Sequence, residues 1–432
     1  MTDQITEIPD SALGGTDRLK RRHRSEKLFR HLGISSIIVA TLVLVALIGT
    51  MIEKGASALI QSHIALTVEL DKSQIDPNDT KDPEIIGQAS FGSITKRAIR
   101  RQFPDVKSRR DKRALYKIYS RGAAFKVRDF AMANPEKIGE TVTLWVQSSS
   151  DIDLLMKGGI DRKLIEADRR VKDNQIKWVD RLIQGNRIEK RFNSTFFMFA
   201  DSREPEQAGI LGAAIGSALT LLVTLLLVFP IGVSSAIYLE EFAPKNKWTD
   251  LIEVNINNLA AVPSIVFGLL GLAVLLNFFE LPRSTPVVGG IVLALMTLPT
   301  IIISGRSALM AVPPSIREAA YGVGASPVQT VLHHVFPLAL PGMLTGTIIG
   351  MARALGETAP LLMIGMVAFI VDLPEGFTDA ATVLPVQIFL WADAPERAFA
   401  ERTAAATIVL LIFLILMNLA AILLRRKFEI KW

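Results

Sequence analysis

PGMLTGTIIGMARALGETAPL, residues 341–361, is a mostly apolar stretch that carries a basic and an acidic side chain, Arg353 and Glu357. A membrane span needs about 20 apolar residues, and one ionised side chain at the bilayer centre costs about 3 kcal/mol or more. We expect a span over 342–370, in which Arg353 lies about ten residues from the start, near mid-depth at about 1.5 Å per residue. The sequence therefore predicts a charge pair inside a membrane.

The pair has i,i+4 spacing, which places both charges on one face of a helix. At about 100° per residue that face also holds three glycines and a proline within an arc of about 80°: Gly342, Gly346, Gly350 and Pro360. One interpretation is a buried ion pair that fixes helix packing. The other is a polar lining, with the glycines on the pathway face, for an ion or polar solute.

The composition combines membrane and soluble character. The 432 residues are 50% hydrophobic but include 48 Lys and Arg and 42 Asp and Glu, as expected for apolar spans joined to a charged soluble part. The absence of cysteine excludes disulfides and thiol catalysis. A net charge of +6 does not indicate nucleic acid, and the five histidines show no metal-ligand spacing, so no metal site is predicted.

The first apolar run, residues 34–52, has the length of a transmembrane helix. A basic cluster precedes it: Arg18, Lys20, Arg21, Arg22, Arg24, Lys27 and Arg30. Such clusters favour the cytoplasmic side, so residues 1–33 are predicted to be a cytoplasmic tail. The run is longer than the core of a signal peptide, which indicates an uncleaved helix.

Residues 53–208 contain no spanning segment and hold 29 basic and 23 acidic residues. We expect a soluble domain outside the membrane, on the periplasmic side, of small α/β or mainly helical type. A strand is predicted at 140–147, an amphipathic helix at 160–183 and basic helical turns over 94–128. We also expect this domain to be dispensable for the translocation path.

Five further spans are expected within 209–424, near 209–239, 256–279, 287–304, 342–370 and 404–424. The fold class is thus an α-helical polytopic membrane protein with six transmembrane helices and a soluble domain inserted between the first two. Six crossings return the chain to the cytoplasm, where the basic tail 425–432 and the connection 305–341 would lie.

The segment 313–341 reads PPSIREAAYGVGASPVQTVLHHVFPLALP. Ser315 and Glu318 form a capping-box pattern, Gly322 and Gly324 end the helix that follows, and Ser326-Pro327-x-Gln329 begins a second helix. The pattern predicts a knob of two short helices joined by a glycine elbow. It is either a simple re-entry turn or a lever that another subunit holds.

Glu318-Ala319-Ala320, Gly324 and Pro337 resemble the Glu-Ala-Ala loop of membrane subunits of ATP-binding-cassette (ABC) importers. The resemblance implies a type I importer core over 209–424, in which the loop 305–341 docks into a cleft on an ATPase subunit. ATP would be used by that partner, and this chain would bind no cofactor itself.

ARALGETAPLL, residues 352–362, is similar to the signature of phosphate-importer permeases of the PstA type. The resemblance implies that Arg353 and Glu357 belong to the translocation pathway. It also implies a bacterial inner-membrane location with both termini cytoplasmic, a PstC-type permease partner, a PstB-type ATPase dimer and a PstS-type periplasmic phosphate-binding protein. The domain 53–208 looks like the extension of a longer subgroup.

Two alternatives remain open at this point. The chain could be a permease for another oxyanion, such as sulfate, molybdate or phosphonate, or a membrane sensor with an external ligand-binding domain. An enzyme is disfavoured, because no G-x-S-x-G or H-E-x-x-H motif occurs and no catalytic residue is assigned. No Gly-Lys dipeptide is present, so if transport is driven by ATP, the ATPase must be a separate chain. The sequence does not decide whether Arg306 contacts substrate.

Overall fold

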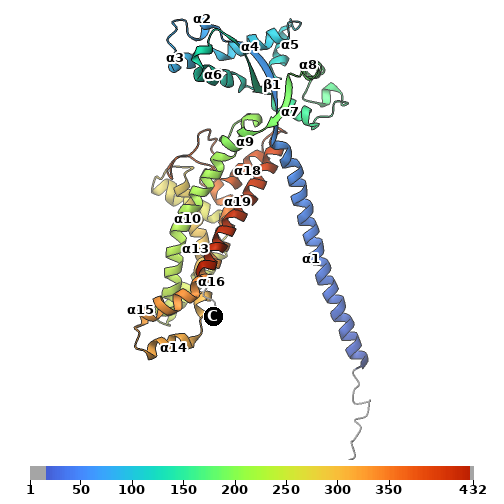
Figure 1. Cartoon of the computed structure of the whole chain (residues 1–432). Coiled ribbons are helices and arrows are strands. Elements are labelled where there is room, and N and C mark those ends of the chain that lie inside the picture. The colour runs from blue at the N-terminus through green and yellow to red at the C-terminus, as the bar shows by residue number, and fades with distance from the viewer. Residues whose placement is uncertain (1–15, 429–432) are drawn as a thin grey trace, which may run out of the picture. The chain divides into compact units, whose positions relative to one another are not determined.

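A computed structural model of the chain describes residues 16–428 and divides it into two units, Met1–Glu53 and Lys54–Trp432 (Figure 1). The ends of the two expected tails, 1–15 and 429–432, lie outside the described residues.

The first unit consists of most of helix α1, Thr16–Ala58. The predicted span 34–52 is confirmed as helical, but the helix is longer at both ends, since nothing in the flanking sequence breaks it. Residues 16–33 of the expected tail are therefore helical as well. The segment Arg21–Ala58 is long and apolar enough to cross a membrane.

The inserted domain, residues 59–208, is built on a three-stranded antiparallel sheet of β1 Ile60–Glu69, β2 Thr141–Gln147 and β3 Ile188–Phe192. The order is β2-β1-β3, so the first strand is central. The strand predicted at 140–147 is confirmed as β2. Because Ile60 pairs with Phe192, the entry and the exit of the domain lie side by side.

Helices complete the domain, and its hydrophobic core includes Ile64, Leu66 and Phe103. They are α2 Lys72–Ile75, α3 Pro83–Gly87, α4 Phe91–Gln102, α5 Arg109–Tyr116, α6 Ala123–Ala133, α7 Ser150–Lys157, α8 Asp173–Gln184 and α9 Ser194–Met198. The expected helical turns of 94–128 are confirmed. The helix expected over 160–183 is wrong in its first half, because Asp161 accepts a hydrogen bond from the Lys163 backbone in a turn and Leu164 is exposed.

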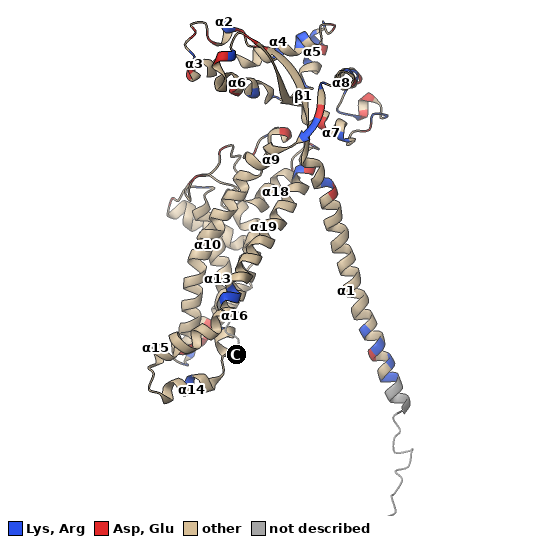
Figure 2. Ribbon diagram, viewed as in Figure 1, with Lys and Arg blue, Asp and Glu red and all other residues tan. Residues whose placement is uncertain are grey.

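The remaining chain is a bundle of apolar helices. These are α10 Leu211–Ile237 with a π turn at Tyr238–Phe242, α11 Lys247–Ala260, α12 Ser264–Leu270 with a π segment at Gly271–Phe278, α13 Pro286–Met310, α14 Pro314–Gly322, α15 Pro327–Thr330, a π turn at Val331–Val335, α16 Phe336–Gly356, α17 Ala359–Met363, α18 Leu384–Ala392 and α19 Phe399–Phe428. Figure 2 shows that α10, α13, α16 and α19 carry few charges along most of their length.

Among the described residues, five helices are long and apolar enough to cross a membrane, or six if one bent pair counts as a span. The bent pair is Lys247–Ala260 with Ser264–Phe278, which meet at 103°. The expected span 256–279 covers the last turn of the first arm, the break at 261–263 and the second arm. Pro263 disfavours a helical conformation in the residue before it. The count of six spans stays a prediction.

The span expected over 342–370 is wrong in its limits. The helical apolar segment runs from Pro327 to Gly356, and α17 begins only at Ala359. Gly356 is a weak helix former, and Pro360 lacks the amide that a continuous helix would need. Residues beyond Met363 form turns and irregular chain up to α18.

Contacts at glycines show the relative directions of α10, α13 and α16. Added to Gly290, a Cβ would lie 2.5 Å from Val223, and added to Gly232 it would lie 2.7 Å from Ile301, so α10 and α13 run in parallel. Gly342 faces Ala308 and Gly346 faces Ser304, so α16 runs in the opposite direction. Small residues allow these helices to approach at backbone distance.

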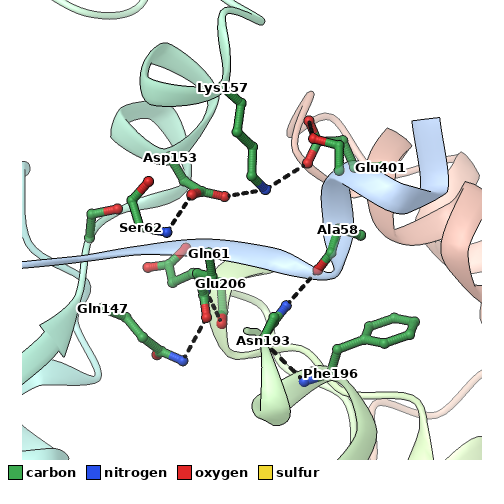
Figure 3. A network of polar contacts seen from close by, with 12 residues as sticks. Ala58, Gln61, Ser62, Gln147, Asp153, Lys157, Asn193, Phe196, Glu206 and Glu401 are labelled. Atoms are coloured by element: carbon green, nitrogen blue, oxygen red, sulfur yellow. Dashed lines mark hydrogen bonds and ion pairs between the residues drawn. The ribbon is translucent and has the colours of Figure 1, made fainter. Parts of the chain in front are cut away.

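A buried ion-pair network joins the inserted domain to α19 (Figure 3). The Lys157 Nζ lies 2.6 Å from Asp153 Oδ2 and 3.0 Å from Glu401 Oε2. Ser57 donates a hydrogen bond to the other Glu401 oxygen at 2.9 Å, and Asp153 accepts one from the Ser62 backbone at 2.7 Å. The side chains of Lys157 and Asp153 are only 9% exposed.

Neutral hydrogen bonds complete this junction. The buried Gln61 amide donates to the Glu206 backbone carbonyl at 2.7 Å, and Asn193 donates to the Ala58 carbonyl at 2.9 Å (Figure 3). Burial raises the pKa of the Glu206 carboxyl above its ordinary value. The expected dispensability of the domain stays a prediction, and its deletion would uncover these groups.

Replacing Lys157 by alanine is expected to destabilise the chain strongly, because Asp153 and Glu401 would keep their buried charges without the cation. Loss of one partner of a buried ion pair costs about 3 kcal/mol. The midpoint of thermal unfolding in detergent checks this, with Lys163→Ala as the control at an exposed lysine. Equal midpoints for the two variants would show that the network contributes little.

Candidate functional site

Arg353 and Glu357 lie together at the end of α16. The Arg353 Nε is 3.6 Å from Glu357 Oε1, and the two side chains are 50% and 21% exposed. Glu357 is the first residue beyond the helix, with φ −80° and ψ 127°. The predicted contact is therefore present, but the predicted single helix face is wrong, because the chain leaves the helix between the two charges.

The packing of α16 against α13 gives the depth of Arg353. Gly346 lies opposite Ser304 and Gly350 opposite Ile301 in the antiparallel pair. Three further residues along α16 correspond to about three fewer along α13, near Leu298, which is the middle residue of Pro286–Met310. Arg353 thus lies in the last turn of α16, at the level of the middle of α13.

A second broken helix packs beside this end. A Cβ on Gly268 of α12 would lie 2.6 Å from the Pro360 Cα of α17, so the two short helices touch through their backbones. α12 follows the break at 261–263, and α17 follows the break at 357–358. Broken helices at membrane depth are tolerated where protein or a water-filled path surrounds them.

The three glycines on the Arg353 side of α16 serve helix packing. A Cβ on Gly346 would lie 1.9 Å from Ser304 Oγ, and one on Gly342 would lie 2.7 Å from Ala308 Cβ. Gly350 faces Ile301 at an ordinary contact distance of 3.5 Å. The expectation that these glycines line a pathway is corrected, because they face α13.

A large, mostly apolar cavity lies elsewhere. It has a volume of about 710 Å³ and is bounded by α10, α16 and α19, with Phe229, Leu344 and Met351 among its lining residues. Arg353 is not part of its wall. Thr347 and Asn418 are the polar residues of a wall that is otherwise apolar, so this cavity suits an apolar group better than an anion.

The predicted knob is confirmed with two corrections. Gly324 has φ +84° and forms the elbow, and Ser326 caps α15 with Gln329 as its capping-box partner. The Ser315 capping box is wrong, since α14 begins at Pro314 and its N-cap position is Pro313. The second helix is not short either, because a π turn continues it into α16.

The four residues predicted to contact the ATPase differ in their solvent exposure. Glu318, Ala319 and Gly324 are exposed, whereas Ala320 is buried. Apolar side chains around them are exposed as well: Tyr321, Val323, Val328 and Leu332. The knob therefore presents an apolar surface with one acidic residue.

Two arginines that the sequence did not assign anchor this region. Arg317 of α14 pairs with Glu241 at 2.5 Å and donates to the carbonyls of Leu309 and Val312 at 3.1 and 2.9 Å. It thereby fixes the knob to the ends of α10 and α13. In the sequence, the only signals for this contact are the charges themselves: Arg317 before Glu318, and the acidic pair at 240–241.

Arg306 of α13 is also held by carboxylates. Its guanidinium lies 3.2 Å from Glu240 and 2.8 Å from Glu253, which ties α13 to α11. In the structure, Arg306 is therefore an ion-pair partner of these two carboxylates. Among residues 16–428, no group of three or more His, Asp or Glu side chains is arranged to hold a metal ion.

Comparisons with known proteins identify the class. Residues 228–431 match the family described as binding-protein-dependent transport system inner membrane component, and residues 16–166 match a domain of unknown function, DUF3333. The first match indicates a membrane subunit of a binding-protein-dependent transport system.

Individual relatives identify the family more closely. Phosphate transport system permease protein PstA 1 of Mycobacterium tuberculosis is 31% identical over 223 residues, which cover 51% of this chain and 72% of that protein. PstA of Pasteurella multocida is 29% identical over 50% of this chain and 76% of that protein. The probable ABC transporter permease YqgH of Bacillus subtilis is 34% identical over 42% and 60%. The chain belongs to the PstA-type phosphate transport permeases.

Gly346→Ala is expected to lower the unfolding midpoint more than Gly350→Ala. The new methyl would meet both Ser304 Oγ at 1.9 Å and Ser304 Cβ at 2.4 Å, so rotation of the hydroxyl would not relieve the clash. Overpacking of this kind costs about 1–3 kcal/mol. Thermal unfolding in detergent checks the order, and Ser304→Gly should restore the midpoint. The reverse order would contradict the packing role of Gly346.

Proposed function

We propose that this chain forms the pathway of an ATP-driven importer of inorganic phosphate, together with a homologous PstC-type subunit. The observation that carries the proposal is the half-exposed Arg353 where α16 ends, at about the mid-depth of α13. An arginine at such a depth is costly in lipid and is typical of a substrate pathway. Relatives named as phosphate transport permeases favour phosphate over other oxyanions.

The chemistry of the pair suits an anion. The planar guanidinium presents several N–H groups that match two oxygens of a phosphate at once. Its contact with Glu357 is long for an ion pair, at 3.6 Å, and Arg353 keeps half of its surface free. An arriving anion would take the place of Glu357 at the guanidinium, and the carboxylate would hold Arg353 in position while the site is empty.

ATP hydrolysis would reach this site through the knob. The exposed Glu318 and the surrounding apolar side chains would dock on a PstB-type ATPase. Arg317 would carry the movement of α14 to α10 and α13, because it contacts both. A PstS-type protein would deliver phosphate on the opposite side, where the inserted domain stands, in a bacterial inner membrane with both termini in the cytoplasm.

Phosphate uptake in a strain without this chain is the direct test, with sulfate uptake as the control. Arg353→Ala is expected to abolish phosphate uptake although the protein still reaches the membrane, and Arg353→Lys should also fail, because a single ammonium does not reproduce the two-pronged contact. Arg283→Ala, at an exposed loop arginine, should transport normally. Normal phosphate uptake by the Arg353 alanine variant would reduce the pair to a packing feature.

Gly324→Val is expected to lower both uptake and cross-linking to the ATPase. A branched side chain at φ +84° is strained, so the elbow would shift the knob. The control is Gly322→Ala, since that glycine lies in helical backbone with nothing within 4 Å of the added methyl. If cross-linking is unchanged in the Gly324 variant, the knob is not the docking surface.

A further inference from the structure

A patch of exposed apolar side chains lies where the inserted domain meets α10. Its members are between 39% and 65% exposed: Ile60, Phe192, Phe197, Met198 and Phe199. Three of them are in contact, because Ile60 pairs with Phe192 across β1 and β3 and the Phe192 ring stacks on Phe197 with centroids 5.8 Å apart. Met198 and Phe199 follow Phe197 directly in the chain. Contiguous exposed patches of this kind mark sites of contact.

The patch is attached firmly to the start of α10. The Leu211 amide donates to the Phe199 carbonyl at 3.1 Å, and the Ile210 amide donates to the Phe196 carbonyl at 2.8 Å. A Cβ on Gly209 would lie 2.2 Å from the Phe199 carbonyl oxygen, so the two segments touch through their backbones. The height of α9 relative to the span is therefore fixed.

That height coincides with the edge of the hydrocarbon layer. On α19, the charged residues Glu401 and Arg402 precede an apolar run of membrane-spanning length, 404–424, so the edge lies near the start of that run. The Arg402 guanidinium carbon is 5.6 Å from the centroid of the Phe196 ring on α9. The side chains that follow Phe196 on α9 thus lie at the level of the lipid headgroups.

The chemistry of the patch fits this level. Aromatic side chains concentrate at membrane–water interfaces, and basic side chains beside them attract phospholipid phosphates. Lys190 is exposed two residues before Phe192 and so lies on the same face of β3. Arg203 is also exposed and stacks over Phe369, another exposed aromatic residue, at 5.2 Å.

We propose that this patch rests in the headgroup–acyl boundary of the bilayer, on the side that carries the inserted domain. Phospholipid is its occupant, and the domain is held on the membrane by this contact in addition to the ion-pair network at α19. The role is independent of the transported substrate.

The absence of cysteine from the chain makes the test direct. Met198→Cys introduces a single thiol at an exposed position, and a nitroxide attached to it reports its surroundings in the full chain reconstituted in phosphatidylglycerol–phosphatidylethanolamine nanodiscs. Leu416→Cys, exposed within α19, supplies the lipid reference, and Phe125→Cys, exposed on α6 of the inserted domain, supplies the aqueous reference. Accessibility to oxygen, which enters lipid, is compared with accessibility to a water-soluble nickel chelate.

The ratio of oxygen to nickel accessibility at Met198 is expected to shift clearly from the Phe125 value toward the Leu416 value. A ratio equal to that at Phe125 would place the patch in water and overturn the proposal. Protection from both reagents that appears only when a PstC-type subunit is reconstituted alongside would assign the patch to a protein interface, and would overturn it as well.

Discussion

The bundle depends on the close approach of α13 to its two neighbours. Glycines lie at these contacts, on α13 and α10 on one side and on α16 on the other, so backbones meet where side chains would otherwise keep helices apart. In lipid there is no hydrophobic drive for helices to associate, so such dense packing must supply the attraction. The register that results fixes where α16 ends, and with it the depth of Arg353.

The break in α16 and the break before α12 have a common consequence. Each interrupts an apolar helix without leaving the bundle, and the segments that follow touch at Gly268 and Pro360. If α16 and α17 were one continuous helix, Glu357 would lie on the same helix face as Arg353, where the two charges could form a closer ion pair. The extended backbone at Glu357 instead leaves the guanidinium half free.

The sequence predicted well the features that depend on local composition. Long apolar runs located the helices, alternating residues located β2, and Gly324 and Ser326 located the elbow and the cap that follows it. Local patterns gave wrong predictions where the structure depends on a contact between distant residues, or where a second local signal favours another helix start. Pro313 and Pro314 overrode the capping box at Ser315, and the glycines of α16 looked like a pathway face because only the fold reveals α13 beside them. The ion-pair partner of Arg317, Glu241, lies 76 residues away, so no spacing rule could pair them.

The adjacency of β1 and β3 determines how the domain is joined to the helices. Because Ile60 pairs with Phe192, about 130 residues begin and end at one point of the chain. A segment with adjoining ends occupies the place of a short connection, so it fits into an existing bundle without moving the helices on either side, and closing a loop of that length adds little entropy cost beyond that of a shorter one. Lys157 and Glu401 then tie this segment to α19 at the same point, so one side of the domain carries both its chain connections and its ion pair to the bundle.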